Sequence, residues 1–328
     1  MHSVMRTIFP VFAFRVMHRV ILLTRFCKLL TIVAILLILS GGALSNFKRQ
    51  VSDTSAIICR LSACVTDIAT WCASRRLQLN AAKTEIAWFG SRANLNKISG
   101  LDLCLPVGSN VIKPREVVRD LGVYLDSELS FKQHITKVAN SCFHHLRRLR
   151  QIRRSIDEDV MIQLVVAFVL SRIDYCNAVL AALPRSTIEP LQRVQNAAAR
   201  LVFGLRSHDH ITPALAQLHW LPVQFRIKFK LCLLMHQIHV GRCPAYLAEL
   251  VSSSAENCRR SGLRSTSTST SGYSKPRLRT KFAERAFSFS GPAEWNCLPN
   301  DLRMITDTNV FKRKLKANIY KHAFCVLA

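Results

Sequence analysis

Acidic residues are scarce in this chain of 328 residues: 20 Asp and Glu stand against 46 Lys and Arg, which leaves a formal net charge of +26 at pH 7. This excess is far beyond what solubility requires, and it favours polyanionic partners such as nucleic acid or acidic membrane surfaces. Hydrophobic residues make up 49% of the chain, so it can bury a substantial core and is not disordered as a whole. The length suggests two domains rather than one.

The short motifs on which several enzyme classes depend are also missing. The sequence contains no P-loop, no H-E-x-x-H and no G-x-S-x-G, and it therefore gives little support to an enzyme of those classes or to a small-molecule substrate. Asp174, beside Tyr175, is a single acidic group on an apolar helical segment. We interpret Asp174 as a capped or paired helix residue.

No two of the twelve cysteines form a C-x-x-C pair, and they are scattered over a long chain. We interpret them as reduced, mostly buried thiols of an intracellular protein. His236 and His239, with Cys232 and Cys243 nearby, are the set that invites a zinc interpretation. Their spacing matches no familiar zinc framework and the segment has helical apolar periodicity, so we predict packing and surface roles and no metal site.

The first 45 residues differ from the rest. Residues 29–39 are eleven uncharged, mostly apolar residues that follow a basic flank. This run is short for a membrane span, which needs about 20 residues, and is closer to the core of a secretory signal. Residues 20–39 reach that length if Arg25 and Lys28 snorkel to the interface. A signal anchor, a cleaved signal and an extension without targeting meaning all stay open, although the cysteines and the basic body argue against secretion.

Residues 46–126 are expected to form a small α+β unit. A stripe at helical spacing predicts an amphipathic helix over residues 52–77, with its apolar side chains at Ile57, Leu61, Cys64, Val65, Ile68, Trp71 and Cys72. The turn "LNAAKTE" follows, and then a short strand stopped by Gly90, a loop to about residue 115, and a strand from Val117 to Leu125. Lys83 in this turn is either simply solvated or, at a sheet edge, able to donate a proton or hold a phosphate.

Residues 127–251 are helical in pattern. One stripe defines a helix that begins near Phe131 and consists of Phe131, Ile135, Val138, Cys142, Phe143, Leu146 and Leu149. Its far end carries "RRLRQIRR", whose five arginines are Arg147, Arg148, Arg150, Arg153 and Arg154. A basic run is often only a solvated face, but the total charge favours phosphate contact. Further helices are predicted near residues 158–182 and 188–203, separated by Pro184, and from Pro222 to Gly241.

The composition changes again after residue 251. Residues 252–281 contain "STSTSTS", and seven basic residues and no acidic one lie between Asn257 and Ala283, which is typical of a flexible basic linker. Residues 282–328 are predicted to form a small C-terminal module, in which "AFSFSGPAEWNCLPNDLR" is aromatic and turn-rich. The module ends in a basic helix with Phe311, Leu315 and Ile319 on one face. The predicted fold class is α+β, with helix dominating.

Six segments, taken together and in order, resemble the C-terminal half of a reverse transcriptase (RNA-directed DNA polymerase) from a non-LTR (LINE-type) retrotransposon. They are "TWCASRRLQLNAAKTEIAWFGS", "VRDLGVYLDSELSFKQHI", "SRIDYCNAVLAALP", "LQRVQNAAARLV", "LHWLPVQFRIKFKLCLL" and "ERAFSFSGPAEWNCLPNDLR". The resemblance covers roughly residues 46–328 and is far more specific than any single segment. It implies a partial polymerase palm at residues 46–126 and a helical thumb and connector at residues 127–251.

The resemblance gives several residues a role. Lys83 matches a lysine that lies near the incoming nucleotide in such polymerases and is thought to protonate the pyrophosphate leaving group. Leu121, Gly122, Val123 and Tyr124 look like the primer grip, and the helices after Phe131 look like the thumb that holds the primer–template duplex. The parent family makes DNA on an RNA template with two magnesium ions, usually beside an endonuclease on the same polypeptide.

The sequence departs from the family at the metal-binding carboxylates, and this departure matters more for activity than the resemblance. Reverse transcriptases hold the two metals with an Asp-Asp pair, because two-metal phosphoryl transfer needs carboxylates at that point. This sequence has no Asp-Asp pair, and "LLILSGGALSNFKRQ" stands in the expected place. We therefore expect a truncated, inactive chain without bound metal or other cofactor, in which Lys83 has no reaction to serve. The expected residual activity is sequence-independent binding of RNA or an RNA–DNA duplex by the five arginines.

Membrane anchoring is the alternative to nucleic-acid binding. If residues 20–39 span a membrane, the chain is a single-pass anchored basic protein whose body binds anionic lipid or a protein partner. Cys325 in the final "CVLA" also fits a C-a-a-X prenylation signal with basic residues upstream. The first hypothesis places the protein in the nucleus or cytoplasm, and the second places it at a membrane.

Overall fold

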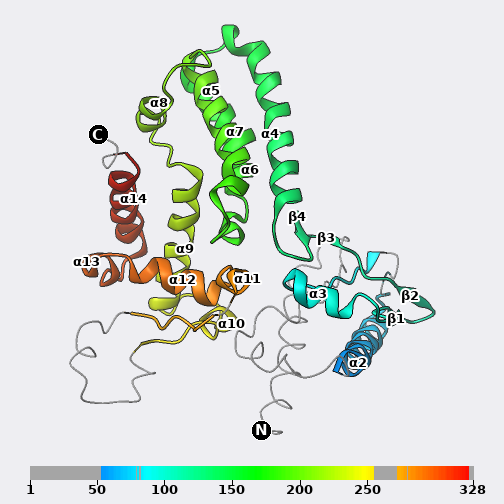
Figure 1. Ribbon diagram of the computed structural model, residues 1–328. Coiled ribbons are helices and arrows are strands. Elements are labelled where there is room, and N and C mark those ends of the chain that lie inside the picture. The colour runs from blue at the N-terminus through cyan, green and yellow to red at the C-terminus, as the bar shows by residue number, and fades with distance from the viewer. Residues whose placement is uncertain (1–52, 79, 81–82, 255–271, 279, 325–328) are drawn as a thin grey trace, which may run out of the picture. The chain divides into compact units, whose positions relative to one another are not determined.

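The computed structural model describes residues 53–78, 80, 83–254, 272–278 and 280–324 (Figure 1). Helices dominate these residues and the strands are short, so the prediction of a mostly helical α+β fold is confirmed. The chain divides into two compact units, whose described residues lie within 53–129 (unit 1) and 130–324 (unit 2). We describe each unit by itself. The hydrophobic run at residues 20–39, most of the Ser/Thr-rich stretch and Cys325 lie outside the described residues.

Unit 1 is built on one long helix, as its apolar stripe predicted. Its elements are α2 (Asp53–Ser74), α3 (Arg92–Ile98), β1 (Leu105–Val107), β2 (Asn110–Ile112), β3 (Val117–Asp120) and β4 (Val123–Asp126). Leu61 and Val65 of α2 are buried in one cluster with Ile86, Leu105 and Val107. The helix therefore buries its apolar side against the hairpin of β1 and β2, which removes that surface from water.

The strand predicted directly after the lysine turn does not form. Only Ile86 is paired there, in an isolated parallel bridge with Pro114. Proline has no backbone N–H to donate, so a ladder cannot continue through it. The predicted loop up to residue 115 was also wrong in part, because it contains α3 and the antiparallel hairpin of β1 and β2.

The single strand predicted for residues 117–125 is a hairpin instead. Strands β3 and β4 pair antiparallel, with Asp120 opposite Val123. Leu121 and Gly122 form the two-residue turn with φ angles of 44° and 86°, and two positive φ angles are what a hairpin of this length requires. Glycine adopts this conformation at little cost, whereas leucine does so rarely. The apolar residues on both sides of the turn favoured one strand, and Gly122 was the signal that marked the turn.

Unit 2 is helical throughout its described residues. Its elements are α4 (Lys132–Ile152), η2 (Arg153–Ser155), α5 (Glu158–Val165), η3 (Val166–Leu170), α6 (Ser171–Asp174), η4 (Asn177–Leu180), α7 (Arg185–Phe203), α8 (Thr212–Gln217), α9 (Val223–His239), α10 (Ala245–Ala248), α11 (Lys281–Glu284), α12 (Phe287–Asn296), α13 (Asn300–Arg303) and α14 (Thr308–Phe324). Helix α7 packs against both α4 and α9 (Figure 1).

Most of the helices predicted in this unit are present, with changed ends. Helix α9 agrees with the segment predicted between Pro222 and Gly241. The helix predicted over residues 158–182 ends earlier, at Asp174, and includes the π-helical segment η3. It stops there because Tyr175 is extended and Cys176 has a φ of 52°, which no right-handed helix contains.

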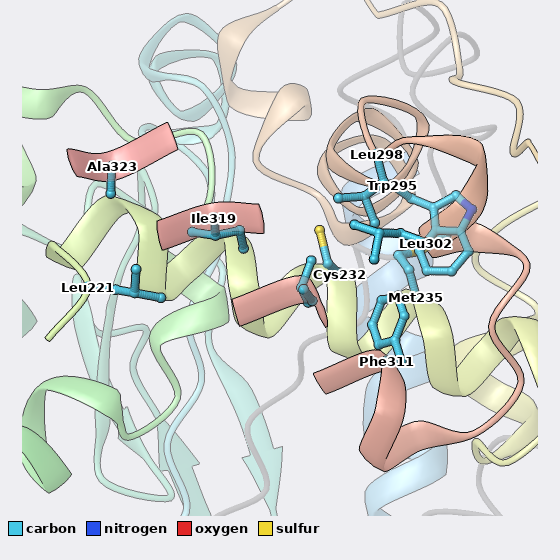
Figure 2. Packing of buried hydrophobic residues seen from close by; sticks show 10 residues of the cluster. Leu221, Cys232, Met235, Trp295, Leu298, Leu302, Phe311, Ile319 and Ala323 are labelled. Carbon is cyan, nitrogen blue, oxygen red and sulfur yellow. The ribbon is translucent and has the colours of Figure 1, made fainter. Parts of the chain in front are cut away.

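The C-terminal segments share a core with α9. Figure 2 shows Cys232 and Met235 of α9 packed with Trp295 of α12 and Phe311 of α14. The expectation of a turn-rich segment around Gly291 was wrong, since α12 is a helix there. The predicted basic helix is present as α14, with Phe311, Leu315 and Ile319 buried.

The flanks of the Ser/Thr-rich stretch are held together. Ser253 and Tyr273 form an isolated antiparallel bridge. The Tyr273 N–H donates to Asn296 Oδ1 at 3.0 Å, and Asn296 Nδ2 donates to the Tyr273 carbonyl at 2.7 Å. These bonds fix residue 273 to α12, so the chain on both sides of residues 255–271 belongs to unit 2.

Candidate nucleic-acid interface

Helix α4 carries no acidic residue along its length. Its inner side buries Ile135, Ala139, Cys142, Leu146 and Leu149 against the rest of unit 2. Phe143 was predicted in this stripe and was placed wrongly, because its side chain is 37% exposed. Phe143 directly follows the buried Cys142, so its side chain lies about 100° further around the helix and outside the buried stripe. The outer side of α4 is therefore basic, with an aromatic side chain among the cations.

Three of the five predicted arginines lie on this outer side of α4, and a fourth, Arg154, follows directly in η2. Arg147, Arg148, Arg150 and Arg154 are all exposed. None of the ion pairs found among the described residues involves any of the four. These ion pairs therefore do not neutralise their charges. Arg147, Arg150 and Arg154 follow one another at spacings of three and four residues, which places them on successive turns, whereas Arg148 lies about 100° around the helix from Arg147. Such an array favours phosphate, since each guanidinium presents a planar fork of donors.

Arg153 differs from its neighbours. It is partly buried, and its Nε and Nη2 atoms donate to the carbonyls of Leu201 and Val202 at 3.0 Å and 2.7 Å. Both carbonyls lie in the last turn of α7, where carbonyls have no intrahelical partner and the helix dipole favours a cation. Arg153 therefore joins the end of α4 to the end of α7 and is a structural residue in this fold.

We expect Arg153→Gln to lower the free energy of unfolding by about 1–2 kcal/mol, because the shorter side chain leaves two carbonyls without a charged donor. Urea unfolding of the whole chain measures this change. Arg154→Gln is the matched control, since Arg154 is exposed, and it should change stability little. Equal effects of the two substitutions would contradict the structural role of Arg153.

Other basic side chains of unit 2 also serve the fold. Arg226 Nη1 lies 2.5 Å from Asp174 Oδ2, and Arg226 Nε donates to the Leu221 carbonyl. This pair confirms that Asp174 is a paired helix residue. Arg200 donates to the carbonyls of Arg206 and Asp209. The surface available to an anionic partner is therefore smaller than the net charge suggests.

Lys83 lies in unit 1, exposed, on the turn after α2. Asn80 holds this turn, because its carbonyl accepts from the Lys83 N–H at 3.1 Å and from the Thr84 hydroxyl at 2.9 Å. Glu85 is paired with Arg115 at 2.5 Å. Among the residues that the structure describes, no group of three His, Cys, Asp or Glu side chains is placed to hold a metal ion.

The segment that resembles the primer grip lies on the second hairpin of unit 1. Leu121, at its tip, is 69% exposed, whereas Val123 is buried. The Arg119 guanidinium lies 5.5 Å from the centre of the Tyr124 ring, a cation–π distance. The hairpin thus presents an apolar tip on a paired scaffold, and its role in gripping a primer stays a prediction.

Of the two histidines that invited a zinc interpretation, His236 lies in the aromatic core of unit 2, whereas His239 is exposed and its ring lies 5.3 Å from that of Trp295. His236 is fully buried, its Nε2 lies 2.9 Å from the Ile305 carbonyl oxygen, and its ring stacks on Phe311 at 4.0 Å. Burial lowers the pKa of His236, which is therefore neutral at physiological pH. Burial also raises the pKa of the Cys232 thiol to about 12. The structure gives these two side chains packing roles.

Within the described part of the chain, one helix is long and apolar enough to cross a membrane. It is residues 54–74 of α2. A core helix or a signal sequence can pass the same test; here 17% of the apolar window is buried, including Leu61 and Val65, which cluster with residues of β1. The predicted span at residues 20–39 lies outside the described residues.

Comparisons of the chain with protein-family models, with curated proteins and with solved structures found no match.

Proposed function

We propose that this chain derives from a LINE-type reverse transcriptase, does not polymerise by itself, and binds nucleic acid without regard to sequence through α4. One observation carries the binding proposal: Arg147, Arg148 and Arg150 are exposed on α4, which has no acidic residue, and Arg154 is exposed directly after it in η2. The partner is RNA or an RNA–DNA duplex. The family origin rests on the six sequence segments described above.

The geometry of α4 suits a polyanion. Arg154 follows Arg147 by seven positions, which is about 10 Å of helical rise. One strand of a duplex presents about three phosphates over that length. Arg147, Arg150 and Arg154 can therefore meet successive phosphates and Arg148 adds a neighbouring cation, all without base contacts, so the affinity depends on salt and little on sequence.

We expect no primer extension, even with magnesium present. The 328 residues contain no Asp-Asp pair, and Lys83, at the family's general-acid position, has no metal-bound triphosphate to protonate. A primer-extension assay under conditions where the chain binds its duplex tests this part of the proposal. Extension by the purified chain would contradict it.

Replacing Arg147, Arg148, Arg150 and Arg154 with glutamine should reduce the slope of log affinity against log salt by about 3, because each lost phosphate contact removes just under one released counterion. Fluorescence anisotropy with a labelled RNA–DNA duplex, repeated at several salt concentrations, measures this slope.

The matched control removes the same charge from another acid-free helix. Lys312, Arg313, Lys314 and Lys316 of α14 are all exposed, and their replacement with glutamine should leave the slope nearly unchanged. An equal loss of slope in both variants would show that binding follows net charge and not α4. Binding to anionic vesicles but not to the duplex would favour a membrane partner instead.

A further inference from the structure

Aromatic and cationic side chains gather where η3 packs against α4. We call this set the α4–η3 cluster, and it consists of His144, His145, Arg148, Phe168 and Arg172. The His145 and Phe168 rings stack, with centroids 5.5 Å apart and an angle of 17° between their planes. Phe168 nevertheless stays 42% exposed. A large aromatic side chain is thus held in place by a neighbour and still open to solvent.

Arg172 is fixed beside these rings. Its Nη1 donates to the Phe168 carbonyl at 3.3 Å, and its Nε donates to the Ser141 hydroxyl on α4 at 3.4 Å. Arg148 lies one turn after His144 on α4. No ion pair among the described residues involves Arg148 or Arg172. The two guanidinium groups therefore create a positive potential that the fold does not neutralise.

The charge of His145 responds to this potential. Burial lowers the pKa of His145, and the nearby Arg172, His144 and Arg148 lower it further. His145 is therefore neutral at physiological pH, and its ring acts as an aromatic surface more than as a cation. An anion placed among these side chains would be stabilised by two arginines without having to displace a carboxylate.

The backbone at this point is unusual. Residues Val166–Leu170 form a π-helical segment inside an otherwise α-helical run. Such segments are rare and occur often at functional sites. Here Val169 and Leu170 are buried while Val166 and Phe168 are exposed. The segment thus presents Phe168 outward without giving up the core contacts on either side.

We propose that the α4–η3 cluster binds a single-stranded segment of nucleic acid: an unpaired base stacks on Phe168, and Arg148 and Arg172 bind the adjacent phosphate. This inference rests on the proposed function and names the form of nucleic acid that this part of unit 2 selects. Stacking on a protein ring requires an unstacked base, which a continuous duplex does not offer. The cluster therefore prefers a strand end or a single-stranded region beside the duplex held by α4.

The test compares two labelled ligands with the full chain by fluorescence anisotropy. One is an oligo(dT) of about 12 nucleotides, within the usual range of single-strand site sizes, and the other is a blunt RNA–DNA duplex. Phe168→Leu should weaken oligo(dT) binding about tenfold through lost stacking and leave duplex binding unchanged. Arg172→Gln should reduce the salt slope for oligo(dT) by about 0.7.

Tyr246→Leu is the control, because Tyr246 is an aromatic residue of α10 that is 39% exposed and lies outside both α4 and the cluster. It should leave both affinities unchanged. If Phe168→Leu keeps the affinity for oligo(dT), or if Tyr246→Leu weakens it as much, the inference is overturned while duplex binding by α4 stands. A wild-type chain that binds neither ligand overturns the proposed function as well. Circular dichroism of each variant checks that the helices remain.

Discussion

Replacing Trp295 with alanine should lower the free energy of unfolding of unit 2 by about 3–5 kcal/mol, the usual cost of truncating a buried tryptophan. Trp295 is fully buried, and it is the largest of the completely buried side chains among the described residues. Its ring lies 5.3 Å from that of His239 on α9 and 5.9 Å from that of Phe311 on α14, measured between centroids. Loss of the indole thus leaves a cavity between three helices.

The same substitution tests whether the C-terminal segments form a separate module. Because Trp295 joins α12 to α9 and α14, we expect α9 and the C-terminal helices to unfold together in one transition. Urea unfolding of the full chain with Trp71 and Trp88 replaced by phenylalanine, which leaves buried Trp220 as the only tryptophan other than Trp295, measures both the midpoint and the number of transitions. The signals are far-ultraviolet circular dichroism and tryptophan fluorescence.

Met304→Ala is the control, because Met304 is a large apolar residue of the same region that is mostly exposed. It should shift the midpoint little. An early transition in the Trp295→Ala variant that leaves the signal of Trp220 unchanged would mean that residues 282–324 fold apart from α9.

The elements that were predicted well from the sequence are the long helices, in which an amphipathic pattern continues over several turns. Helices α2, α4, α9 and α14 each repeat apolar residues every three or four positions, so one side of each had to be buried. The hairpins were missed because strands of three or four residues give too few alternations to identify. Single positions at the edge of a stripe were also uncertain, and Phe143 was assigned to the wrong side for that reason.

The candidate interface shows a second limit. Composition alone indicated five arginines, but the role of Arg153 depends on Leu201 and Val202, which are distant in sequence. The α4–η3 cluster could not be predicted either. It needs Phe168 to meet His145 across two helices, and the π-helical segment changes the helical phase on which such a prediction depends.

Gly291 of α12 lies close to Met235 of α9. A Cβ atom added at Gly291 would lie 2.8 Å from Met235 Sδ and 3.0 Å from the Phe287 ring. Met235 is itself fully buried, so it has little room to move. Glycine in a helix interior costs stability relative to alanine, and the close contact is the physical reason for a glycine at this position.

We therefore expect Gly291→Val to destabilise unit 2 by about 3 kcal/mol, at the upper end of the overpacking range, because a β-branched side chain meets two neighbours. Urea unfolding measures the change. A double-mutant cycle with Met235→Ala gives the sharper result, because removing the thioether should relieve the clash. The double variant should therefore lose about 1–2 kcal/mol less unfolding free energy than the sum of the losses in the two single variants. Strict additivity would mean that the two side chains do not meet, and that α12 does not pack on α9 as the structure has it.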